Sequence, residues 1–229
     1  MRLIVTCEHA TAAIPAPYAD LIAGARHLLD SHRALDIGAR EVCRVLEELA
    51  DGAVYGECSR LLIDLNRSLH HPELFSDFSR DLSLHEKQKV IERWYTPFRS
   101  TALAAVRQTI ARHGAVLHLS VHSFTPVLNG VVRSSDIGIL YDPKRPDEKE
   151  FARHLAKEML ETDRHLSVRM NYPYRGVADG HTTALRRLFD GESYLGIEIE
   201  INQRLLGDDR GRTAVGEILA VALGRLESR

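Results

Sequence analysis

Two patterns of apolar residues alternate along this chain, and together they predict its secondary structure. Short runs of apolar, often β-branched residues, which are typical of strands, cover residues 2–7, 53–57, 60–65, 115–122, 137–141, 166–170 and 194–201. Apolar residues at helical spacing predict helices over residues 36–50, 83–113, from 147 onward, 182–190 and 213–227. Strands that alternate with helices indicate α/β layers around a mixed, largely parallel central sheet.

Local signals mark where several of these helices begin and end. Ser83 followed by Glu86 is a capping-box pattern, so a helix is expected to start there. Pro97 is expected to kink that helix, because proline lacks the backbone N–H that the helix needs, and Gly114 to end it. Gly52 stands where the helix over residues 36–50 would need a C-terminal cap.

The last predicted strand carries an unusual set of polar residues. Residues 194–202 read Tyr-Leu-Gly-Ile-Glu-Ile-Glu-Ile-Asn, so Glu198, Glu200 and Asn202 share one face. Burying a carboxylate costs several kcal/mol unless a cation, a metal ion or hydrogen-bond donors compensate it. We therefore expect this face to meet partner groups supplied by other parts of the chain.

Histidine and acidic residues occur at the ends of other predicted strands. Glu8 and His9 follow the first apolar run, and His118-x-Ser120-x-His122 lies in another. In α/β sheets, ligands bind beyond the carboxyl ends of the strands. Side chains predicted at such ends are those of His9, Asn66, His122 and Glu200. This combination of imidazole and carboxylate groups predicts a metal-dependent hydrolase.

Each of these residues also has an interpretation without function. Glu8 and His9 together are a common exposed loop pair, and His122 could be a core histidine bonded to the backbone. Asp36 could serve as the N-cap of the helix that follows it. His118 is better explained by a structural role, or by orienting a neighbour, than by binding metal.

The segment of residues 59–68 is the second informative feature. Arg60 and Arg67 flank an apolar run in which Asp64 and Asn66 share a face. A guanidinium group binds a carboxylate in bidentate fashion, and an asparagine amide can add a hydrogen bond. The segment therefore predicts a receptor for an anionic group of a substrate. The alternative is an Asp64–Arg67 pair on the surface.

Composition narrows the class of protein. A chain of 229 residues with 44% hydrophobic and 27% charged residues fits one large globular domain over residues 1–229. A net charge of −2 gives no reason to expect nucleic acid as a partner, and no apolar stretch is long enough for a membrane span. The start lacks the features of a signal peptide. Three cysteines without paired spacing predict buried, reduced thiols in the cytoplasm.

Five short motifs are spread over most of the chain. They are Cys7-Glu8-His9, Asp36-x-Gly38-Ala39, Ser59-Arg60-Leu61 with Asp64-Leu65-Asn66-Arg67, His122-Ser123-Phe124 and Ile199-Glu200-Ile201-Asn202. Together these motifs resemble the N-formylglutamate amidohydrolase family. That family is similar in fold to the zinc carboxypeptidases and aspartoacylases, which implies a three-layer α/β sandwich of the zinc-dependent exopeptidase type.

The resemblance also implies roles for individual residues. It implies one zinc ion held by His9, His122 and a carboxylate, which is left open between Asp36 and Glu8 because the His-x-x-Glu pair of the relatives is absent. It implies Glu200 as the general base. The substrate carboxylate would be bound by Arg60, Asn66 and Arg67.

A glycine-bearing segment before the last strand resembles a loop that lies over the site in the family. It runs from Asn171 to Thr182, and Arg175 or His181 could contact substrate from it. Exposure to solvent is the alternative for His181, and helix capping the alternative for Thr182.

The predicted reaction is zinc-dependent hydrolysis of an N-acyl amino acid, with N-formylglutamate, which would give glutamate and formate, as the substrate that the resemblance implies. The partner is then a small-molecule carboxylate. Two alternatives stay open, a carboxypeptidase-like zinc hydrolase of another N-acyl amino acid or short peptide, and a non-catalytic module that binds a small anion. The sequence does not determine the acyl group, the oligomeric state or the pathway.

Overall fold

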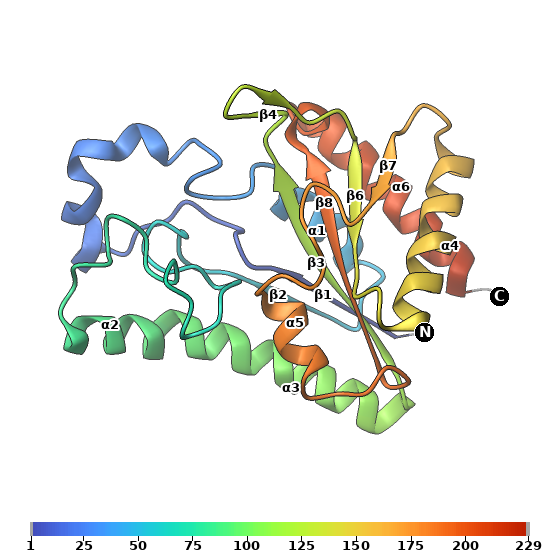
Figure 1. The fold of residues 1–229 in the computed structure, drawn as a ribbon, viewed down its shortest axis with the longest axis horizontal. Coiled ribbons are helices and arrows are strands. Elements are labelled where there is room, and N and C mark those ends of the chain that lie inside the picture. The colour runs from blue at the N-terminus through green and yellow to red at the C-terminus, as the bar shows by residue number, and fades with distance from the viewer. Residues whose placement is uncertain (1, 228–229) are drawn as a thin grey trace.

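The computed structural model describes residues 2–227 and contains a six-stranded sheet at its centre (Figure 1). The strand order is β2-β1-β3-β8-β6-β7. Strands β1, β2, β3 and β8 run parallel, whereas β6 and β7 run in the opposite direction. The strand bounds are β1 Arg2–Cys7, β2 Gly52–Tyr55, β3 Val116–Phe124, β6 Ile137–Leu140, β7 Val168–Met170 and β8 Tyr194–Asn202. The mixed, largely parallel sheet is the one that the sequence predicts.

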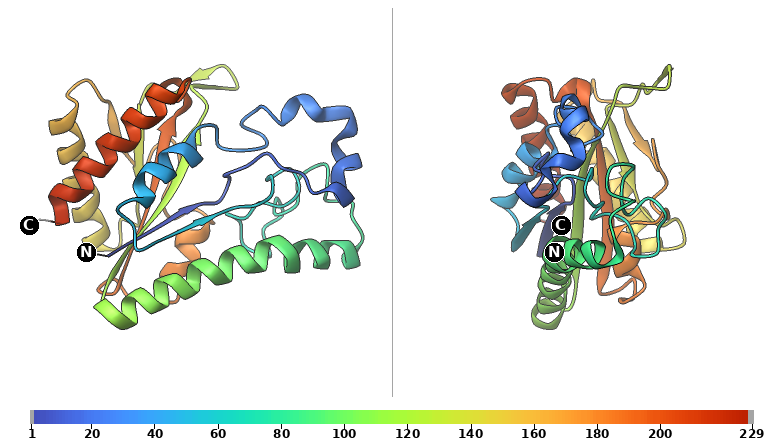
Figure 2. Two further views of the ribbon diagram at one scale, coloured as in Figure 1. Left: turned by 180° about the vertical axis from the view of Figure 1, so that it is seen from behind. Right: turned by 90° about the vertical axis from the view of Figure 1, so that its left-hand side faces the viewer.

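Helices cover both faces of this sheet, which makes three layers (Figure 2). Helices α1, α4 and α6 pack on one face, and α3 and α5 on the other. The helix bounds are α1 Ala39–Glu47, α2 Leu84–Val90, α3 Thr96–His113, α4 Pro146–Thr162, α5 His181–Arg186 and α6 Asp209–Glu227. None of the helices over residues 2–227 is long and apolar enough to span a membrane.

The two central strands, β3 and β8, are enclosed by the layers around them. Every residue of β3 and of β8 is buried, because the helical layers cover both of their faces. Their apolar side chains join the main core cluster with those of α1, α4 and α6. The polar residues of these strands are therefore enclosed as well, and must find partners inside the protein.

One predicted strand is wrong. Residues 60–65 form turns in place of a strand, so Asn66 does not follow a strand. Ser59 directs the chain here, since its hydroxyl accepts a hydrogen bond from the backbone N–H of Leu61 and its carbonyl accepts one from that of Leu62. The apolar residues of the run are nevertheless buried, in two clusters apart from the main core. Leu62, Ile63 and Leu65 pack with apolar residues of the segment 74–98, and Leu61 packs with Ile22 and Ala34. Burial without β pairing gives the same sequence pattern as a strand.

The helix signals are confirmed at the start of α2 and at Gly114. The hydroxyl of Ser83 accepts a hydrogen bond from the backbone N–H of Glu86, 3.2 Å away. A π-helical turn, η2 (Ile91–Tyr95), joins α2 to α3 just before Pro97, and α3 ends at Gly114. Proline and π-turns are the usual causes of an irregular long helix.

Other elements begin later than predicted or were not predicted. Helix α1 starts at Ala39 and not at residue 36, because Gly38 has a φ of 78° that interrupts the helix. The carboxylate of Asp36 is thereby free to point elsewhere. A 3₁₀ segment, η1 (Ala16–Leu28), and a hairpin of β4 (Val127–Leu128) and β5 (Val131–Val132) were not predicted. A short 3₁₀ turn, η3 (Gln203–Leu205), follows β8.

Candidate active site

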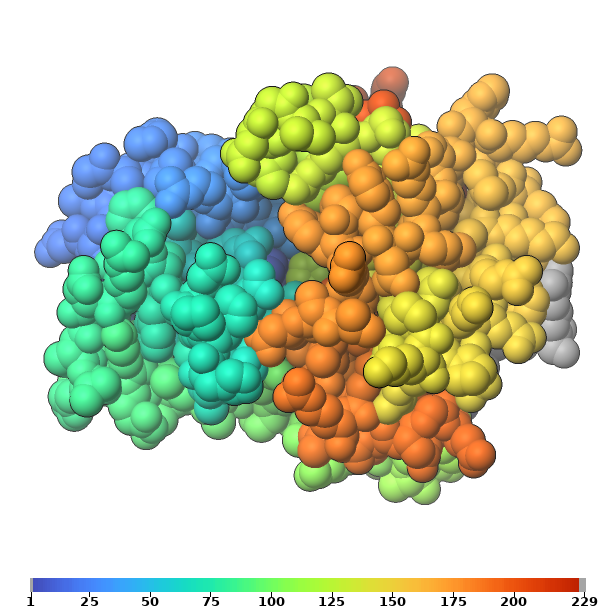
Figure 3. All heavy atoms as spheres, viewed as in Figure 1, coloured from blue at the N-terminus to red at the C-terminus, as the bar shows by residue number. Residues whose placement is uncertain are grey.

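The carboxyl ends of three parallel strands bring the predicted polar residues together. His9 follows β1, His122 lies in β3 and Glu200 in β8, and His122 and Glu200 are paired in the sheet register. A cavity of about 200 Å³ opens at this edge, and Figure 3 shows the surface hollowed between the teal segment near residue 70 and the orange segment near residue 175. Its lining residues include His9, Asp36, Arg60, Asp64, Asn66, Arg67, His122, Arg175, Glu198 and Glu200.

His9, Asp36 and His122 form a buried cluster at the inner end of the cavity. The Nδ1 atom of His122 lies 2.8 Å from Oδ2 of Asp36, and the Nδ1 atom of His9 lies 3.3 Å from the same oxygen. One donor atom from each of the three residues lies within 4.8 Å of the other two. Two imidazoles and a carboxylate at this spacing are the donor set of a catalytic zinc site.

The remaining nitrogen of each imidazole has its own partner. Nε2 of His9 lies 2.7 Å from Oδ1 of Asp64, and Nε2 of His122 lies 2.9 Å from the hydroxyl of Ser120. Histidines that bind metal commonly hold their second nitrogen in this way, which fixes the ring orientation. The orientation of both rings therefore fits metal binding through Nδ1.

The charges in this cluster compensate one another. Burial by itself would raise the pKa of Asp36, but the charge and hydrogen bonds of His9 and His122 hold it well below its usual value. Burial would lower the pKa of His122, but its hydrogen bond to Asp36 and the charge of Glu8 raise it to about 10. These shifts mean that the cluster binds protons firmly where no cation is present, and a divalent cation would replace those protons.

Glu200 has a different environment from the other carboxylates. Burial raises its pKa to about 8, with the charge of His122 opposing the shift and those of Asp36 and Glu198 adding to it. Its Oε2 atom is buried, and no group within residues 2–227 forms a hydrogen bond with it. A buried carboxylate oxygen without a partner needs one, and it lies beside a donor set that fits a metal ion. A group with a pKa shifted towards neutrality is suited to accept and release a proton.

The cationic residues of the cavity are not equivalent. Arg60 is paired with Asp64 at 2.9 Å and with Asp36 at 3.4 Å, so its charge is already compensated. Arg67 donates a hydrogen bond to the backbone carbonyl of Asp179, 3.1 Å away, and Arg175 makes no hydrogen bond or ion pair through its side chain within residues 2–227. Arg67 and Arg175 therefore have donors left for an anionic ligand.

Asn66 connects the cavity to the loop before α5. Its Oδ1 atom accepts a hydrogen bond from the backbone N–H of His181, 2.7 Å away. The neighbouring backbone N–H of Ser68 donates to the carboxylate of Asp179 at 2.8 Å. Together with the Arg67 contact, these bonds hold residues 66–68 against the loop before α5. The predicted segment over the site thus lies beside the cavity, as expected.

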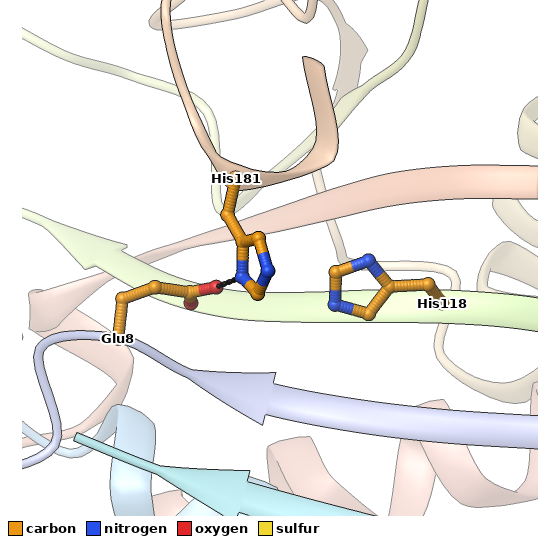
Figure 4. Close-up of side chains that lie close together, drawn as sticks. All are labelled: Glu8, His118 and His181. Atoms are coloured by element: carbon orange, nitrogen blue, oxygen red, sulfur yellow. Dashed lines mark hydrogen bonds and ion pairs between the residues drawn. The ribbon is translucent and has the colours of Figure 1, made fainter. Parts of the chain in front are cut away.

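Glu8 does not lie with His9. Its carboxylate turns into a second buried group with His118 and His181, shown in Figure 4. Glu8 accepts hydrogen bonds from the hydroxyls of Thr6 and Ser120 and from Nδ1 of His181, at 2.8–2.9 Å. Because of these bonds and nearby histidine charges, its pKa lies far below the usual value despite burial.

Two further expectations need correction. Solvent exposure of His181 is wrong, because this side chain is 1% exposed and bonded to Glu8. A surface pair of Asp64 with Arg67 is also wrong, because Asp64 is buried and bonded to His9 and Arg60.

The partner of Glu198 is the hydroxyl of Thr182, and His118 and His122 are bonded elsewhere. Asp64 was missed as a site residue, although an acid two positions before Asn66 in an apolar run was a signal.

The model of the N-formylglutamate amidohydrolase family matches residues 1–207 of this chain. The chain belongs to the N-formylglutamate amidohydrolase family. Membership supports amidohydrolase activity for the chain, as the sequence predicts. No curated protein matches the sequence at a significant level.

Solved structures agree with the fold of this family member. The crystal structure of a gene product from Agrobacterium tumefaciens is 32% identical, with a TM-score of 0.80, and the alignment covers 98% of this chain and 91% of that one. The N-formylglutamate amidohydrolase of Ralstonia eutropha JMP134 is 20% identical, with a TM-score of 0.70, and the alignment covers 99% and 92%. This second likeness is evidence for the fold alone.

Proposed function

We propose that this chain is a zinc-dependent amidohydrolase that cleaves an N-acyl amino acid with a free carboxylate, N-formylglutamate being the first candidate. The observation that supports it best is the donor set of His9, Asp36 and His122 beside the unpartnered Oε2 atom of Glu200. A purely structural set of ion pairs gives no reason for a carboxylate oxygen to lack a partner, whereas a metal ion or a reacting water molecule would be that partner.

The proposed metal ligands are His9, Asp36 and His122. Of the two carboxylates that the sequence leaves open, Asp36 lies with both histidines, while Glu8 accepts hydrogen bonds from three other groups. Three protein ligands leave one position open, which is the arrangement of catalytic zinc sites. These residues would hold a zinc ion, which would polarise the acyl oxygen and make a water molecule more acidic.

Glu200 is the proposed general base. It would accept a proton from the attacking water and pass that proton to the nitrogen of the leaving amino acid. With a pKa raised to about 8, its carboxylate holds a transferred proton more readily than an ordinary glutamate does. Its buried position also keeps bulk water away from the proton during transfer.

The substrate carboxylate is assigned to Arg67 and Arg175, with the amide of Asn66 beside them. Arg60 was expected to share this task, but Asp36 and Asp64 already occupy its guanidinium group, so we assign it to holding these two acids in place. Two cationic groups suit a substrate with two carboxylates, such as an N-acylated acidic amino acid. A volume of about 200 Å³ is below that of pockets for drug-sized ligands, which favours a small substrate.

Cytoplasmic location stays a proposal. The chain has three free cysteines, Cys7, Cys43 and Cys58, all of them buried. Reduced thiols of this kind are typical of proteins in a reducing compartment.

The test combines metal content with substrate hydrolysis. Purified protein should contain zinc close to one ion per chain, and zinc-loaded protein should release formate from N-formylglutamate. The substrate panel should pair N-formylglutamate with N-formylglutamine and N-formylleucine, so that the side-chain carboxylate is the variable. His122→Ala should lose both zinc and activity while staying folded, because it removes one of three ligands.

Each alternative has its own outcome in this panel. Cleavage of C-terminal peptide bonds in preference to N-formyl groups would indicate a carboxypeptidase-like enzyme. Binding of small dicarboxylates without zinc and without hydrolysis would indicate an anion-binding module. Full retention of zinc by His122→Ala would remove His122 from the metal site.

A further inference from the structure

A chain of buried hydrogen bonds links the second histidine group to the proposed metal site. Thr6 and Ser120 are register partners on β1 and β3, and each hydroxyl donates to one oxygen of Glu8, at 2.9 Å and 2.8 Å. All three side chains are at most 1% exposed. The oxygen of Ser120 is also 2.9 Å from Nε2 of His122. Ser120 is thus the link between Glu8 and a proposed metal ligand.

The direction of these bonds follows from the number of hydrogens available. A hydroxyl has one hydrogen to donate, and an ionised carboxylate can only accept. The hydrogen of Ser120 is given to Glu8, so the Ser120 oxygen must accept from His122. Nε2 of His122 then carries a hydrogen. In the metal-free ring Nδ1 donates its own hydrogen to Asp36, and Nδ1 is the atom that would lose this hydrogen to bind a metal ion.

Other neighbours of Nε2 of His122 do not compete with Ser120. Oε2 of Glu8 lies 3.4 Å away and Nδ2 of Asn66 3.5 Å away, both longer than the 2.9 Å contact to Ser120. Glu8 itself is held by a third donor, Nδ1 of His181, as Figure 4 shows. The carboxylate of Glu8 therefore has a fixed position, and it sets the direction in which the Ser120 hydroxyl points.

We propose that Glu8 and Ser120 are positioning residues that hold His122 with its Nε2 hydrogen towards Ser120 and its Nδ1 atom towards the metal ion. This inference rests on the proposed function for the identity of the metal site. It gives Glu8 a role other than binding the metal ion, and it accounts for a charged residue in a fully buried position. Loss of such a partner of a metal-binding histidine typically lowers metal affinity by about 10–100-fold.

Thr6 provides a matched control. Its hydroxyl is as buried as that of Ser120 and donates to the same carboxylate, but it contacts His118 and not His122. Ser120→Ala and Thr6→Val each remove one hydroxyl from Glu8. Both should lower the melting temperature, whereas only Ser120→Ala should lower zinc affinity, by about 10–100-fold in competition with a chelator. Ser120→Thr, which keeps the hydroxyl, should restore most of that affinity.

Glu8→Gln tests the direction of the bonds at nearly constant volume. An amide can donate to Ser120, which then turns its own hydrogen towards Nε2 of His122 and no longer accepts a hydrogen bond from it. Zinc affinity should therefore fall although no ligand has been removed. The signal of the Nε2-bound hydrogen of His122 in NMR spectra of ¹⁵N-histidine protein should be present in wild type and Thr6→Val, and shifted or lost in Ser120→Ala and Glu8→Gln.

Three results would overturn the inference. Equal zinc affinity in Ser120→Ala and Thr6→Val would reduce Ser120 to a structural role, and an unchanged Nε2 hydrogen signal in Glu8→Gln would remove Glu8 from the chain of bonds. A second zinc ion per chain, lost in Glu8→Gln, would make Glu8, His118 and His181 metal ligands. Wild type that binds no zinc would refute the proposed function, whereas the NMR signal is measured without metal and still tests the bond.

Discussion

Asp64 accepts a hydrogen bond from Nε2 of His9 at 2.7 Å, although the two residues lie 55 positions apart and only His9 follows a strand. The same carboxylate is 2.9 Å from Arg60 and accepts a further bond from the backbone N–H of Asn66. The irregular segment after β2 therefore orients a proposed ligand that the sheet carries.

Asp64→Ala should lower zinc affinity by about 10–100-fold, because His9 loses the acceptor that fixes its ring. Asp64→Asn keeps an acceptor oxygen and should have a smaller effect. Chelator competition on the two variants measures the difference. Equal affinity in wild type and Asp64→Ala would show that His9 does not depend on this bond for metal binding.

Glu200→Gln should keep zinc and lower kcat by about 10²–10⁴-fold, since it removes the proposed base while preserving shape. Glu198→Gln is the matched variant on the same face of β8, and it should be much more active, because the partner of Glu198 is Thr182. The comparison requires kcat at saturating zinc. A dead Glu198→Gln beside a nearly normal Glu200→Gln would reverse the assignment, and two normal variants would refute the mechanism.

Arg67→Lys should raise KM more than it lowers kcat or stability, because a point charge replaces a planar group that binds a carboxylate through two bonds. Arg60→Lys should act differently and mainly weaken zinc binding, since Arg60 holds Asp36 and Asp64. Kinetics with N-formylglutamate and with its α-carboxamide test both points. If wild type cleaves the two compounds equally well, no receptor for the α-carboxylate exists.

The stability of the metal-free protein should depend on the proton of Glu200. Its pKa is about 8 in the folded chain against an ordinary 4.5, so the folded state keeps this proton over a range where the unfolded state has lost it. Stability from this group is complete below pH 4.5 and decreases as the pH rises to about 8. Glu200→Gln lacks this contribution.

The unfolding free energy of Glu200→Gln relative to wild type should therefore increase between about pH 5 and about pH 8. Urea denaturation of both proteins in the presence of a chelator gives this difference. A difference that stays constant over the range would mean that Glu200 titrates near its ordinary value.

Much of the fold could be predicted, because runs of apolar residues in the sequence indicate which strands are buried. The runs that became β3 and β8 are buried on both faces, but one face is largely apolar and the other carries the polar residues, which therefore stand out. The run at residues 60–65 has the same composition but packs against a satellite cluster, and no local pattern separates these two kinds of burial.

The candidate site was predictable where it depends on strand ends and much less so where it depends on side-chain direction. His9, His122 and Glu200 follow from the rule that polar residues gather beyond parallel strands. The adjacent Glu8 turns the opposite way, because Thr6, Ser120 and His181 offer it three donors. The residues joined by these contacts are up to 173 positions apart, so no short sequence motif can reveal them.

The pairing of His122 with Glu200 in the register of β3 and β8 has a consequence for how this family can diversify. The spacing of the two strands, about 4.8 Å, sets the separation of ligand and base, and loop movements cannot change it. The groups assigned to the substrate carboxylate belong to segments outside the sheet, near residues 66–68 and 174–181. New substrates can therefore arise through exchange of loop residues, while the reacting groups keep the same geometry.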